Sequence, residues 1–467
     1  MRRGSLLISG GRIIDPYQGV DMVGDLLIVE GKVTWLGAPG LAPSQQGYSV
    51  LPARGMVVSP GFIDLHCHLR EPGFEGKETV ATGTKAAARG GFTTICCMPN
   101  TAPPVDSPAI VEYIKNKAVK EGVVRVLPIG CITKGQRGEE LVEMRELAEA
   151  GVVAFSDDGK PVANSQLMQR ALEYSCLFDL PIIDHCEDTS LTEGGVMNEG
   201  SLAVRLGLRG MPAAAEVTIV GRDIALAQLA QGRLHIAHVS TAASVELIRR
   251  AKEKRLKVTA EVTPHHLTLT EERVIGYDTS AKVNPPLRTE KDTEALLQGL
   301  KEGVIDAIAT DHAPHTTQDK ACEFDLAAFG ISGLETALGV LLSLVYQGRL
   351  DLVTLVSKLT AEPARIVGGN KNKERGTSSY PYPLPPSLFP IPDGLGTLKV
   401  GAPGDVTVFD PNLEWVVNTD LFASKGKNNP WAGCWLRGKV MATMVGGEVV
   451  YKDDAIRIEA GAKATHG

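Results

Sequence analysis

Features that define three large protein classes are missing from this sequence, and their absence narrows its function. No apolar run in the 467 residues approaches a membrane span, and the start, MRRGSLLISGGRIIDP, lacks the unbroken apolar core of a signal peptide. No block of lysine and arginine concentrates positive charge, and the formal net charge is −7. A nucleic-acid groove or a membrane-surface helix needs such a block. We therefore expect a cytoplasmic protein with no nucleic acid and no membrane as partner.

Cysteine is present, but its spacing excludes a zinc finger and gives no disulfide framework. The eight cysteines are scattered along the chain and form no CxxC pair. In a long cytosolic chain, cysteines are usually reduced and buried as small apolar residues. We expect the same here.

Short β-branched runs alternate with longer alanine-rich, amphipathic stretches through the middle of the chain. This alternation is typical of repeated strand-helix units. Eight such units between residues 56 and 366 favour a closed (β/α)8 TIM barrel, although an open doubly wound sheet has the same local pattern. The predicted strands are 56–66, 92–98, 124–132, 152–156, 181–185, 234–240, 257–263 and 306–312.

Polar and ionisable residues at the ends of these strands separate the two folds. A doubly wound sheet gathers its functional groups at one switch point, whereas a barrel collects them from many strand ends at one mouth. The second pattern is present, so the barrel is preferred. The residues are His66, His68, Asn100, Asp157, Asp158, His185, Glu187, His238, His265, His266, Asp311 and His312.

The two ends of the chain differ from the middle. Residues 1–55 and 396–467 contain short β-like runs separated by glycine turns, and we expect them to pair into one small β-domain. Residues 367–395 form a connecting insertion whose segment 377–394 is rich in proline. Proline excludes a helix or a central strand there, and an extended surface loop is preferred to a polyproline ligand for a partner.

The stretch FIDLHCHLR, residues 62–70, contains the first candidate metal ligands. Side chains alternate along a strand, so His66 and His68 point to one face and Cys67 points to the other. Two imidazoles on one edge suit a divalent cation such as Zn²⁺, with further ligands from elsewhere. A pair of hydrogen-bonded core histidines has the same spacing, so this motif alone leaves both interpretations open.

Four further strand ends favour a metal centre. His185, His238, Asp158 and Asp311 would meet the first two histidines at the barrel mouth, although any one of them alone is more commonly a hydrogen-bonded core or loop residue. Four histidines and two aspartates suffice for two metal ions bridged by a carboxylate. In hydrolases, such a site forms a bridging hydroxide and polarises the carbonyl that it attacks.

As a set, the motifs GFIDLHCHLREPG, TTICCMPNTAPPVD, AFSDDG, DHCED, HIAHVST, KVNPPLR and ATDHAPH resemble the cyclic amidohydrolases, and among them the dihydroorotases of the long bacterial type. The resemblance covers nearly the whole chain. It implies two Zn²⁺ ions, with Asp158 as the bridge and Asp157 as its nearest rival. Hydantoinases and allantoinases use a carbamylated lysine instead, and we expect Lys160 to be an ordinary surface lysine. The implied ligands are His66, His68 and Asp311 for one ion, and His185 and His238 for the other.

The resemblance also implies a set of substrate-binding residues. Two zinc ions carry more charge than Asp158, Asp311 and a hydroxide neutralise, so an anionic substrate is favoured. A guanidinium fork such as that of Arg70 fits a carboxylate bidentately, although a salt bridge at the barrel rim is its alternative role. The implied residues are His68, Arg70, Asn100, Asn284, His315 and the Phe329–Gly330 backbone.

The activity that the resemblance implies is reversible cyclisation of N-carbamoyl-L-aspartate to L-dihydroorotate with loss of water, a step of de novo pyrimidine (UMP) biosynthesis. Asp311 would be both ligand and catalytic acid and base. The alternatives are a hydantoinase-like or allantoinase-like hydrolase and an inactive scaffold for aspartate transcarbamoylase. We expect a homodimer, and a complex with the transcarbamoylase stays open. His235 is expected to pack outside the barrel interior, while His265 and His266 are left out of the site.

Overall fold

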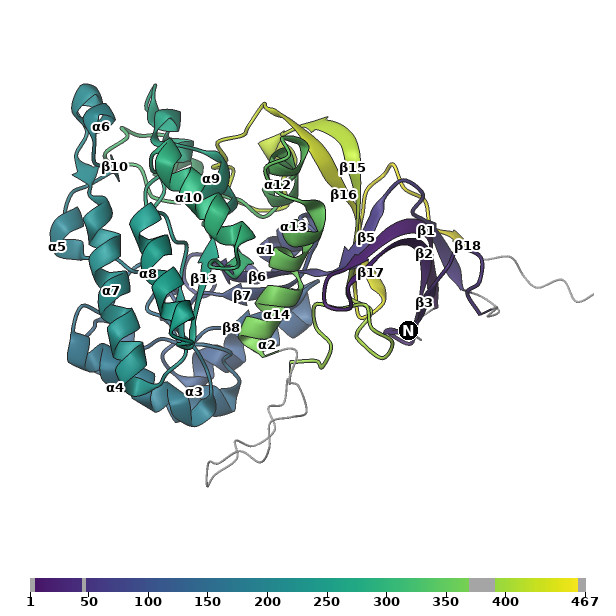
Figure 1. Ribbon diagram of the computed structural model, residues 1–467, viewed down its shortest axis with the longest axis horizontal. Helices are drawn as coiled ribbons and strands as arrows, with labels where there is room; N and C mark the ends of the chain where they lie inside the picture. Colours follow the sequence, from purple (N-terminus) through teal and green to yellow (C-terminus); the bar gives the residue numbers. More distant parts are fainter. Residues whose placement is uncertain (1–4, 44–47, 369–390, 461–467) are drawn as a thin grey trace, which may run out of the picture.

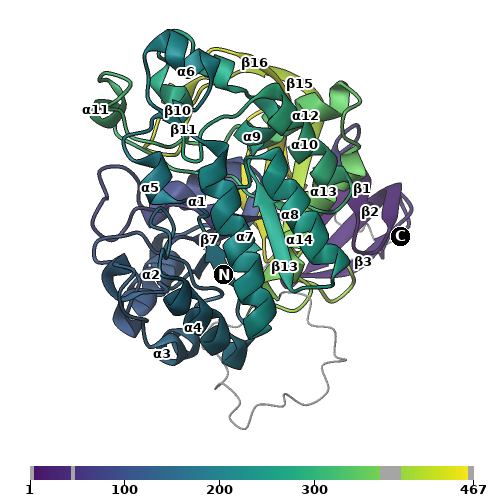
Figure 2. The same ribbon diagram turned by 60° about the vertical axis from the view of Figure 1, so that its left-hand side comes forward.

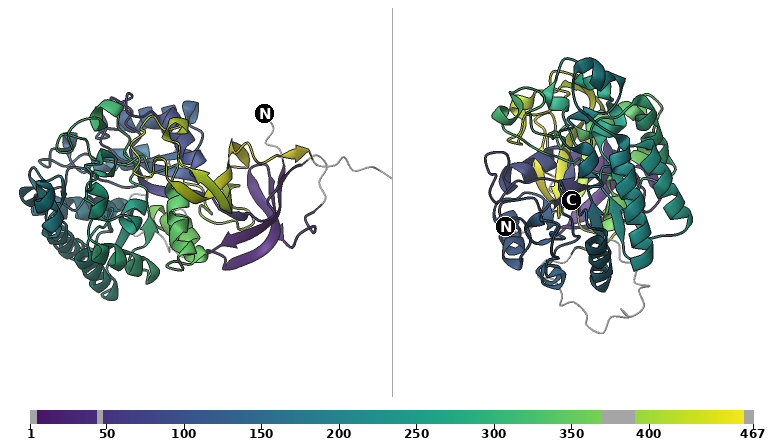
Figure 3. Two further views of the ribbon diagram at one scale, coloured as in Figure 1. Left: turned by 90° about the horizontal axis from the view of Figure 1, so that it is seen from above. Right: turned by 90° about the vertical axis from the view of Figure 1, so that its left-hand side faces the viewer.

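The structure is a computed structural model that describes residues 5–43, 48–368 and 391–460. A barrel of strands wrapped by helices lies beside a sheet that contains both ends of the described chain (Figure 1). The view in Figure 3 shows the two bodies next to each other along the long axis of the molecule. The predicted fold class, a (β/α)8 barrel with a small β-domain formed from both termini, is confirmed.

Parallel strands and three isolated bridges form the barrel. One run of strands is β6-β7-β8 and the other is β9-β12-β13-β14. Phe155 joins the two runs by pairing with Gly130 and Ile182, and Cys67 pairs with His312 at the opposite seam. The strands are β6 (Phe62–Cys67), β7 (Phe92–Cys97), β8 (Arg125–Pro128), β9 (Ile182–Asp184), β12 (Leu234–Ile236), β13 (Val258–Val262) and β14 (Ala307–Ile308).

The fourth and eighth strands are shorter than predicted. In the run 152–156 only Phe155 forms strand bridges, and Asp157 and Asp158 follow directly after the run. The eighth strand stops at Ile308, and the amide of Thr310 donates to the side chain of Asp64 at 2.8 Å instead of to a strand carbonyl. The side chain of Asp64 has therefore replaced a ladder hydrogen bond at the eighth strand, whereas residues 153–156 keep backbone hydrogen bonds to both neighbouring strands.

Amphipathic helices cover the outside of the barrel, and several begin at a side-chain cap. Thr79 and Thr82 form a capping box at the first helix, as do Thr289 and Asp292 at α10. Figure 2 shows α7 and α8 in front of β13. The longer helices are α1 (Val80–Arg89), α2 (Pro108–Glu121), α3 (Met144–Ala150), α4 (Ser165–Ser175), α7 (Ala213–Ala230), α8 (Ala242–Glu253), α10 (Glu290–Lys301), α12 (Ala337–Tyr346), α13 (Leu352–Leu359) and α14 (Ala361–Val367).

The sheet of the β-domain has the order β17-β16-β15-β5-β1-β2-β3, with β4 and β18 attached beside β1. Both ends of the chain contribute, as predicted. The predicted strand 56–66, however, is divided at Gly61 between two sheets. The strands are β1 (Leu6–Asp15), β2 (Val20–Val29), β3 (Lys32–Gly37), β4 (Ser49–Pro52), β5 (Val57–Pro60), β15 (Val406–Val416), β16 (Trp435–Val445), β17 (Glu448–Lys452) and β18 (Glu459–Ala460).

The division at Gly61 has a steric cause. A side chain on Gly61 would collide with Thr93 of β7, so only glycine lets the chain pass from β5 into the barrel there. β5 pairs with β1 and β15, and the predicted boundary between residues 55 and 56 therefore falls before β5, the last strand that the N-terminal part contributes to the terminal sheet.

Other expectations have mixed outcomes. All eight cysteines are free, but Cys434 is exposed and Cys176 and Cys322 are only partly buried. The core of the predicted proline-rich insertion, residues 369–390, lies outside the described residues. Within the described ranges, the helices include none with both the length and the apolarity to cross a bilayer.

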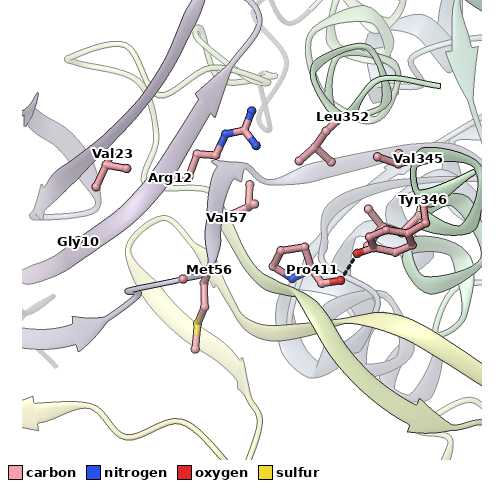
Figure 4. A pocket seen from close by; sticks show the side chains of 11 residues that line it. Gly10, Arg12, Val23, Met56, Val57, Val345, Tyr346, Leu352 and Pro411 are labelled. Atoms are coloured by element: carbon pink, nitrogen blue, oxygen red, sulfur yellow. Dashed lines mark hydrogen bonds between the residues drawn. The ribbon is translucent and has the colours of Figure 1, made fainter. Parts of the chain in front are cut away.

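A cavity of about 390 Å³ lies where the β-domain meets α12 and α13 (Figure 4). Apolar side chains such as Met56 and Leu352 form much of its wall, and Arg12 is the charged residue in its lining. Arg12 is already paired with Asp21 at 2.7 Å. This cavity therefore offers packing space without the convergent polar groups that chemistry requires.

Candidate metal centre and substrate pocket

The structure brings the six predicted ligands together at the carboxyl ends of the barrel strands. Asp158 lies at their centre. Its Oδ1 is 3.3 Å from His66 Nε2, 3.8 Å from His185 Nδ1 and 3.7 Å from His238 Nε2, and its Oδ2 is 3.5 Å from His68 Nε2. A carboxylate that reaches all four imidazoles is in the position that a bridging ligand requires.

Asp311 closes the other side of the centre. Its Oδ1 lies 3.1 Å from His68 Nε2 and 3.5 Å from His66 Nε2. Two sets of three ligand atoms within 4.8 Å of one another result: His66 with His68 and Asp311, and His66 with Asp158 and His238. His185 belongs to neither set, although its Nδ1 is 2.9 Å from His238 Nε2.

These residues fit a metal ion. Within the described ranges, His66 Nε2 and Asp158 Oδ1 are buried atoms without a hydrogen-bond partner. Unsatisfied buried polar atoms are costly, and a coordinated cation removes that cost. The mixture of imidazole nitrogen and carboxylate oxygen suits Zn²⁺.

The electrostatics of the centre favour positive charge. Burial raises the pKa of Asp158, but His66 and His238 outweigh it and hold the carboxyl well below its usual range. Asp311 follows the same pattern, with His66 and His68 lowering its pKa. Burial opposes protonation of His66, yet the charges of Asp158 and Asp311 raise its pKa well above the ordinary value. Both aspartates are thus carboxylates at neutral pH.

Irregular backbone aims several of these side chains. His238, Asp311 and Arg70 have φ angles of +30°, +45° and +62°, in the region that residues other than glycine rarely adopt. The register of β6 against β7 also shifts between Asp64 and Cys67, as in a β-bulge. Such strain is common where a fold positions functional groups.

A buried glutamate beneath the centre was not predicted. His66 Nδ1 donates to Glu261 at 2.8 Å, which leaves His66 Nε2 to face the centre. The other oxygen of Glu261 lies 3.1 Å from His235 Nε2. A charged residue within the apolar run KVTAEVT of β13 was the available signal, because acids are seldom buried without a partner.

The expectation for His235 is therefore wrong. Its neighbours Leu234 and Ile236 belong to the main apolar cluster packed against the helices, so His235 faces the barrel interior. The alternation argument assumed an extended strand as far as His238. The strand ends at Ile236 and His238 has a positive φ, so both histidines point inward.

Two predicted substrate residues also contact the ligands. His68 Nδ1 donates to Asn100 Oδ1 at 2.9 Å. Asn284 Nδ2 donates to Glu187 at 2.8 Å, and the same carboxylate accepts from His185 Nε2 at 2.8 Å. These contacts leave His68 Nε2 and His185 Nδ1 to face the centre.

A pocket of about 300 Å³ opens over the centre and is lined by every predicted substrate residue. Arg70 Nε donates to the Pro314 carbonyl and its Nη2 lies 3.3 Å from His315 Nε2. In the described part of the chain it forms no ion pair, so the rim salt bridge considered above is absent. The Gly330 amide donates to the Lys282 carbonyl, so the amide of that glycine is already occupied.

The rival bridging groups are turned away from the centre. Asp157 accepts from the amides of Ile132 and Thr133 at 2.8 and 3.1 Å, and burial raises its pKa to about 6. Lys160 is exposed. His266, which is not among the predicted site residues, lies in α9 (Pro264–Thr268) and forms hydrogen bonds with Thr263 and with the Pro285 carbonyl.

Fold and site together define a metal-dependent cyclic amidohydrolase. Residues 55–244 match the model of the family described as "Dihydro-orotase-like". The dihydroorotases of Citrifermentans bemidjiense and Pelotomaculum thermopropionicum are each 51% identical to the chain, over 96% and 97% of its length and 100% of theirs. The chain belongs to the dihydroorotase family.

Solved structures show the same architecture. The L-hydantoinase (dihydropyrimidinase) from Arthrobacter aurescens superposes with a TM-score of 0.82 at 25% identity, covering 97% of this chain and 98% of that one. The dihydropyrimidinase from Brevibacillus agri has a TM-score of 0.79 at 23% identity, covering 98% and 97%. The second likeness concerns the fold alone.

Proposed function

We propose that the chain is a dihydroorotase that interconverts N-carbamoyl-L-aspartate and L-dihydroorotate in de novo pyrimidine biosynthesis. The observation that carries this choice is Arg70, whose guanidinium shares one pocket with the two-aspartate centre and has no carboxylate partner among the described residues. A partly buried guanidinium without a carboxylate partner favours a ligand that brings a carboxylate. Dihydroorotate has one on its ring, whereas hydantoin and allantoin have none.

We propose two zinc ions as the cofactor. His66, His68 and Asp311 would hold one, His185 and His238 the other, and Asp158 would bridge them. Zinc bound there supplies a Lewis acid for the ring carbonyl and a lowered pKa for water. The remaining chemistry belongs to side chains of this chain.

Asp311 is the proposed general base and acid. Its lowered pKa keeps it ionised, so it accepts a proton from the water that attacks the ring amide carbonyl. As the carbon-nitrogen bond breaks, Asp311 returns that proton to the leaving ring nitrogen. The reverse sequence closes the ring and releases water.

The other pocket residues bind and orient the ring. Arg70 would pair with the substrate carboxylate, with Asn100 and Asn284 beside it. Burial, together with the charges of Arg70 and Lys77, lowers the pKa of His315 to about 3, so this imidazole is neutral at working pH. A neutral His315 does not repel the Arg70 guanidinium beside it. Both side chains can therefore approach the substrate carboxylate, with Arg70 as its ion-pair partner.

The alternatives are weaker on the same geometry. A hydantoinase-like activity is compatible with the shared fold, but the bridge position holds Asp158 and Lys160 is exposed. A scaffold without activity would not need the six converging ligands. The homodimer, the transcarbamoylase complex and the cytoplasmic location stay predictions.

The test is an assay of the purified protein on dihydroorotate, hydantoin and allantoin, with zinc measured on the same sample. We expect turnover of dihydroorotate alone and about two zinc ions per chain. Asp311→Asn should lower kcat by about 10² to 10⁴-fold while the circular dichroism spectrum stays unchanged. Hydrolysis of hydantoin without dihydroorotate turnover would refute the assignment.

A further inference from the structure

The segment between β15 and β16 leaves the terminal sheet and reaches the barrel mouth. In Figure 1 it is the yellow chain that extends from these strands towards the barrel. Its residues bond to pocket segments that are about a hundred residues earlier in the chain. The β-domain therefore contributes directly to the surroundings of the site.

Asn428 is the residue of this segment with the most contacts to the pocket. It is 5% exposed, and its Oδ1 accepts from the His315 amide at 3.0 Å and from Ser332 Oγ at 2.8 Å. Its Nδ2 donates to the carbonyls of Ala313 and Gly330 at 3.0 and 2.9 Å. One amide group thus uses both donors and both lone pairs on two separate backbone segments.

The two segments that Asn428 joins form one wall of the pocket. Ala313, His315, Phe329 and Gly330 line it, whereas Asn428 is absent from the lining. Gly330 has a φ of +141°, and a Cβ on it would lie 2.7 Å from the Ala313 carbonyl oxygen. The two backbone segments can approach this closely only at one separation. The Asn428 side chain forms hydrogen bonds with both segments and so fixes the distance between them.

We propose that Asn428 is a positioning residue for substrate binding: it holds segments 313–315 and 330–332 together and so places His315 and the Phe329–Gly330 backbone against the substrate. The proposal rests on the dihydroorotase function above. The residue touches neither the metal ligands nor the pocket interior. Its loss should weaken substrate binding more than it slows the chemical step.

Asn429 provides a matched control. It is 2% exposed and adjacent in sequence, and its Nδ2 donates to the Ser332 carbonyl and to Thr336 Oγ1, each at 2.9 Å. Asn429 bonds to neither segment 313–315 nor Gly330. Removing it costs a comparable set of buried hydrogen bonds without breaking the link between the pocket segments.

The experiment compares Asn428→Ala with Asn429→Ala in zinc-loaded protein. We expect Asn428→Ala to raise KM for dihydroorotate about tenfold while kcat stays within about threefold. The Kd for orotate, by calorimetry, should rise in parallel, and zinc content should match the wild type. Asn429→Ala should lower the melting temperature similarly but leave KM and Kd near the wild-type values.

A second variant covers the case in which Asn428→Ala does not fold. Asn428→Asp keeps the shape and the accepting oxygen but replaces the two N–H donors, so it should also raise KM and Kd. Equal KM in wild type and both Asn428 variants would overturn the positioning role, as would equal effects of Asn428→Ala and Asn429→Ala. Absence of dihydroorotate turnover by the wild type would instead refute the proposed function.

Discussion

Glu261 lies beneath the centre and fixes the orientation of His66 through a hydrogen bond. It is 1% exposed, and the protons donated by His235 and His66 overcome the effect of burial and lower its pKa to about 2. A carboxylate that accepts from the far nitrogen of a metal-ligating histidine fixes the ring and its tautomer. Glu261 therefore determines that His66 presents Nε2 to the metal.

Replacing this carboxylate should weaken metal binding. In Glu261→Gln the amide lacks the charge that holds the His66 Nδ1 proton, so we expect zinc affinity to fall about 10 to 100-fold. Competition with a chelator measures this directly and needs no assay of turnover. Glu335→Gln is the control, because Glu335 accepts from Ala423 and Ser424 away from the ligands. Equal zinc retention by both variants would contradict the role of Glu261.

The residues of the site were predictable to different degrees. The candidate ligands His66, His185 and Asp311 end apolar runs, and this pattern is visible in the sequence alone. The contacts of Glu261 and Asn428 were not visible, because each depends on pairing with residues far away in the chain. Alternation also fails where the backbone departs from the extended conformation, which is why His235 was misplaced.

At the scale of elements, the ends of the strands were the least predictable part of the barrel. Apolar patterning located the runs but not where the ladder stops. Strands end early where a side chain accepts from a backbone amide, as Asp64 accepts from the amide and hydroxyl of Thr310. Such a contact forms only when the partner strand is in place. The loop that follows the eighth strand shows the same dependence on distant partners.

Lys282 ties this loop to the barrel. The residue is 2% exposed, and its Nζ donates to the carbonyls of Phe324 and Asp325 at 2.7 and 3.0 Å and lies 4.5 Å from the centre of the Phe329 ring. Its own carbonyl accepts from the Gly330 amide at 2.9 Å. The buried ammonium group of Lys282 thus helps to hold the loop that brings Phe329 and Gly330 to the pocket, together with Asn428 and with Lys320, which donates to the Ala328 carbonyl at 2.6 Å.

Lys282→Met keeps the length of the side chain but removes these donors. We expect the loop to lose order, so that KM for dihydroorotate rises about five- to tenfold with little change in zinc content. Lys358→Met is the control, because Lys358 is also buried and donates to the Ile305 carbonyl at 2.8 Å outside the pocket. Hydrogen exchange of residues 324–330 should increase in the first variant alone. Unchanged exchange there would argue against the anchoring role.

At the scale of the whole molecule, the β-domain and the barrel share a continuous, buried boundary. Asp405 in the β-domain accepts from Arg125 Nη1 at 2.7 Å, and its carbonyl accepts from the Gly61 amide at 2.9 Å. Thr443 Oγ1 donates to the Ala88 carbonyl at 2.7 Å. The composition of the two termini predicted that they pair. It did not predict this boundary, because the run from Met56 to His66 predicts one strand although Ser59, Pro60 and Gly61 interrupt it.

We expect the β-domain and the barrel to unfold in one transition, and a substitution of Asp405 tests this expectation. The carboxylate is 4% exposed and its partner Arg125 keeps about a fifth of its side chain in solvent, so Asp405→Ala should cost about 2 kcal/mol of the free energy of unfolding. The melting temperature should fall by about 2 to 5 °C as one transition. Asp21→Ala removes an ion pair of the same 2.7 Å length, to Arg12, that is exposed on both sides, and should change the melting temperature by less than about 1 °C. Two separate transitions in the wild type, or equal shifts in the two variants, would show that the boundary does not couple the β-domain to the barrel.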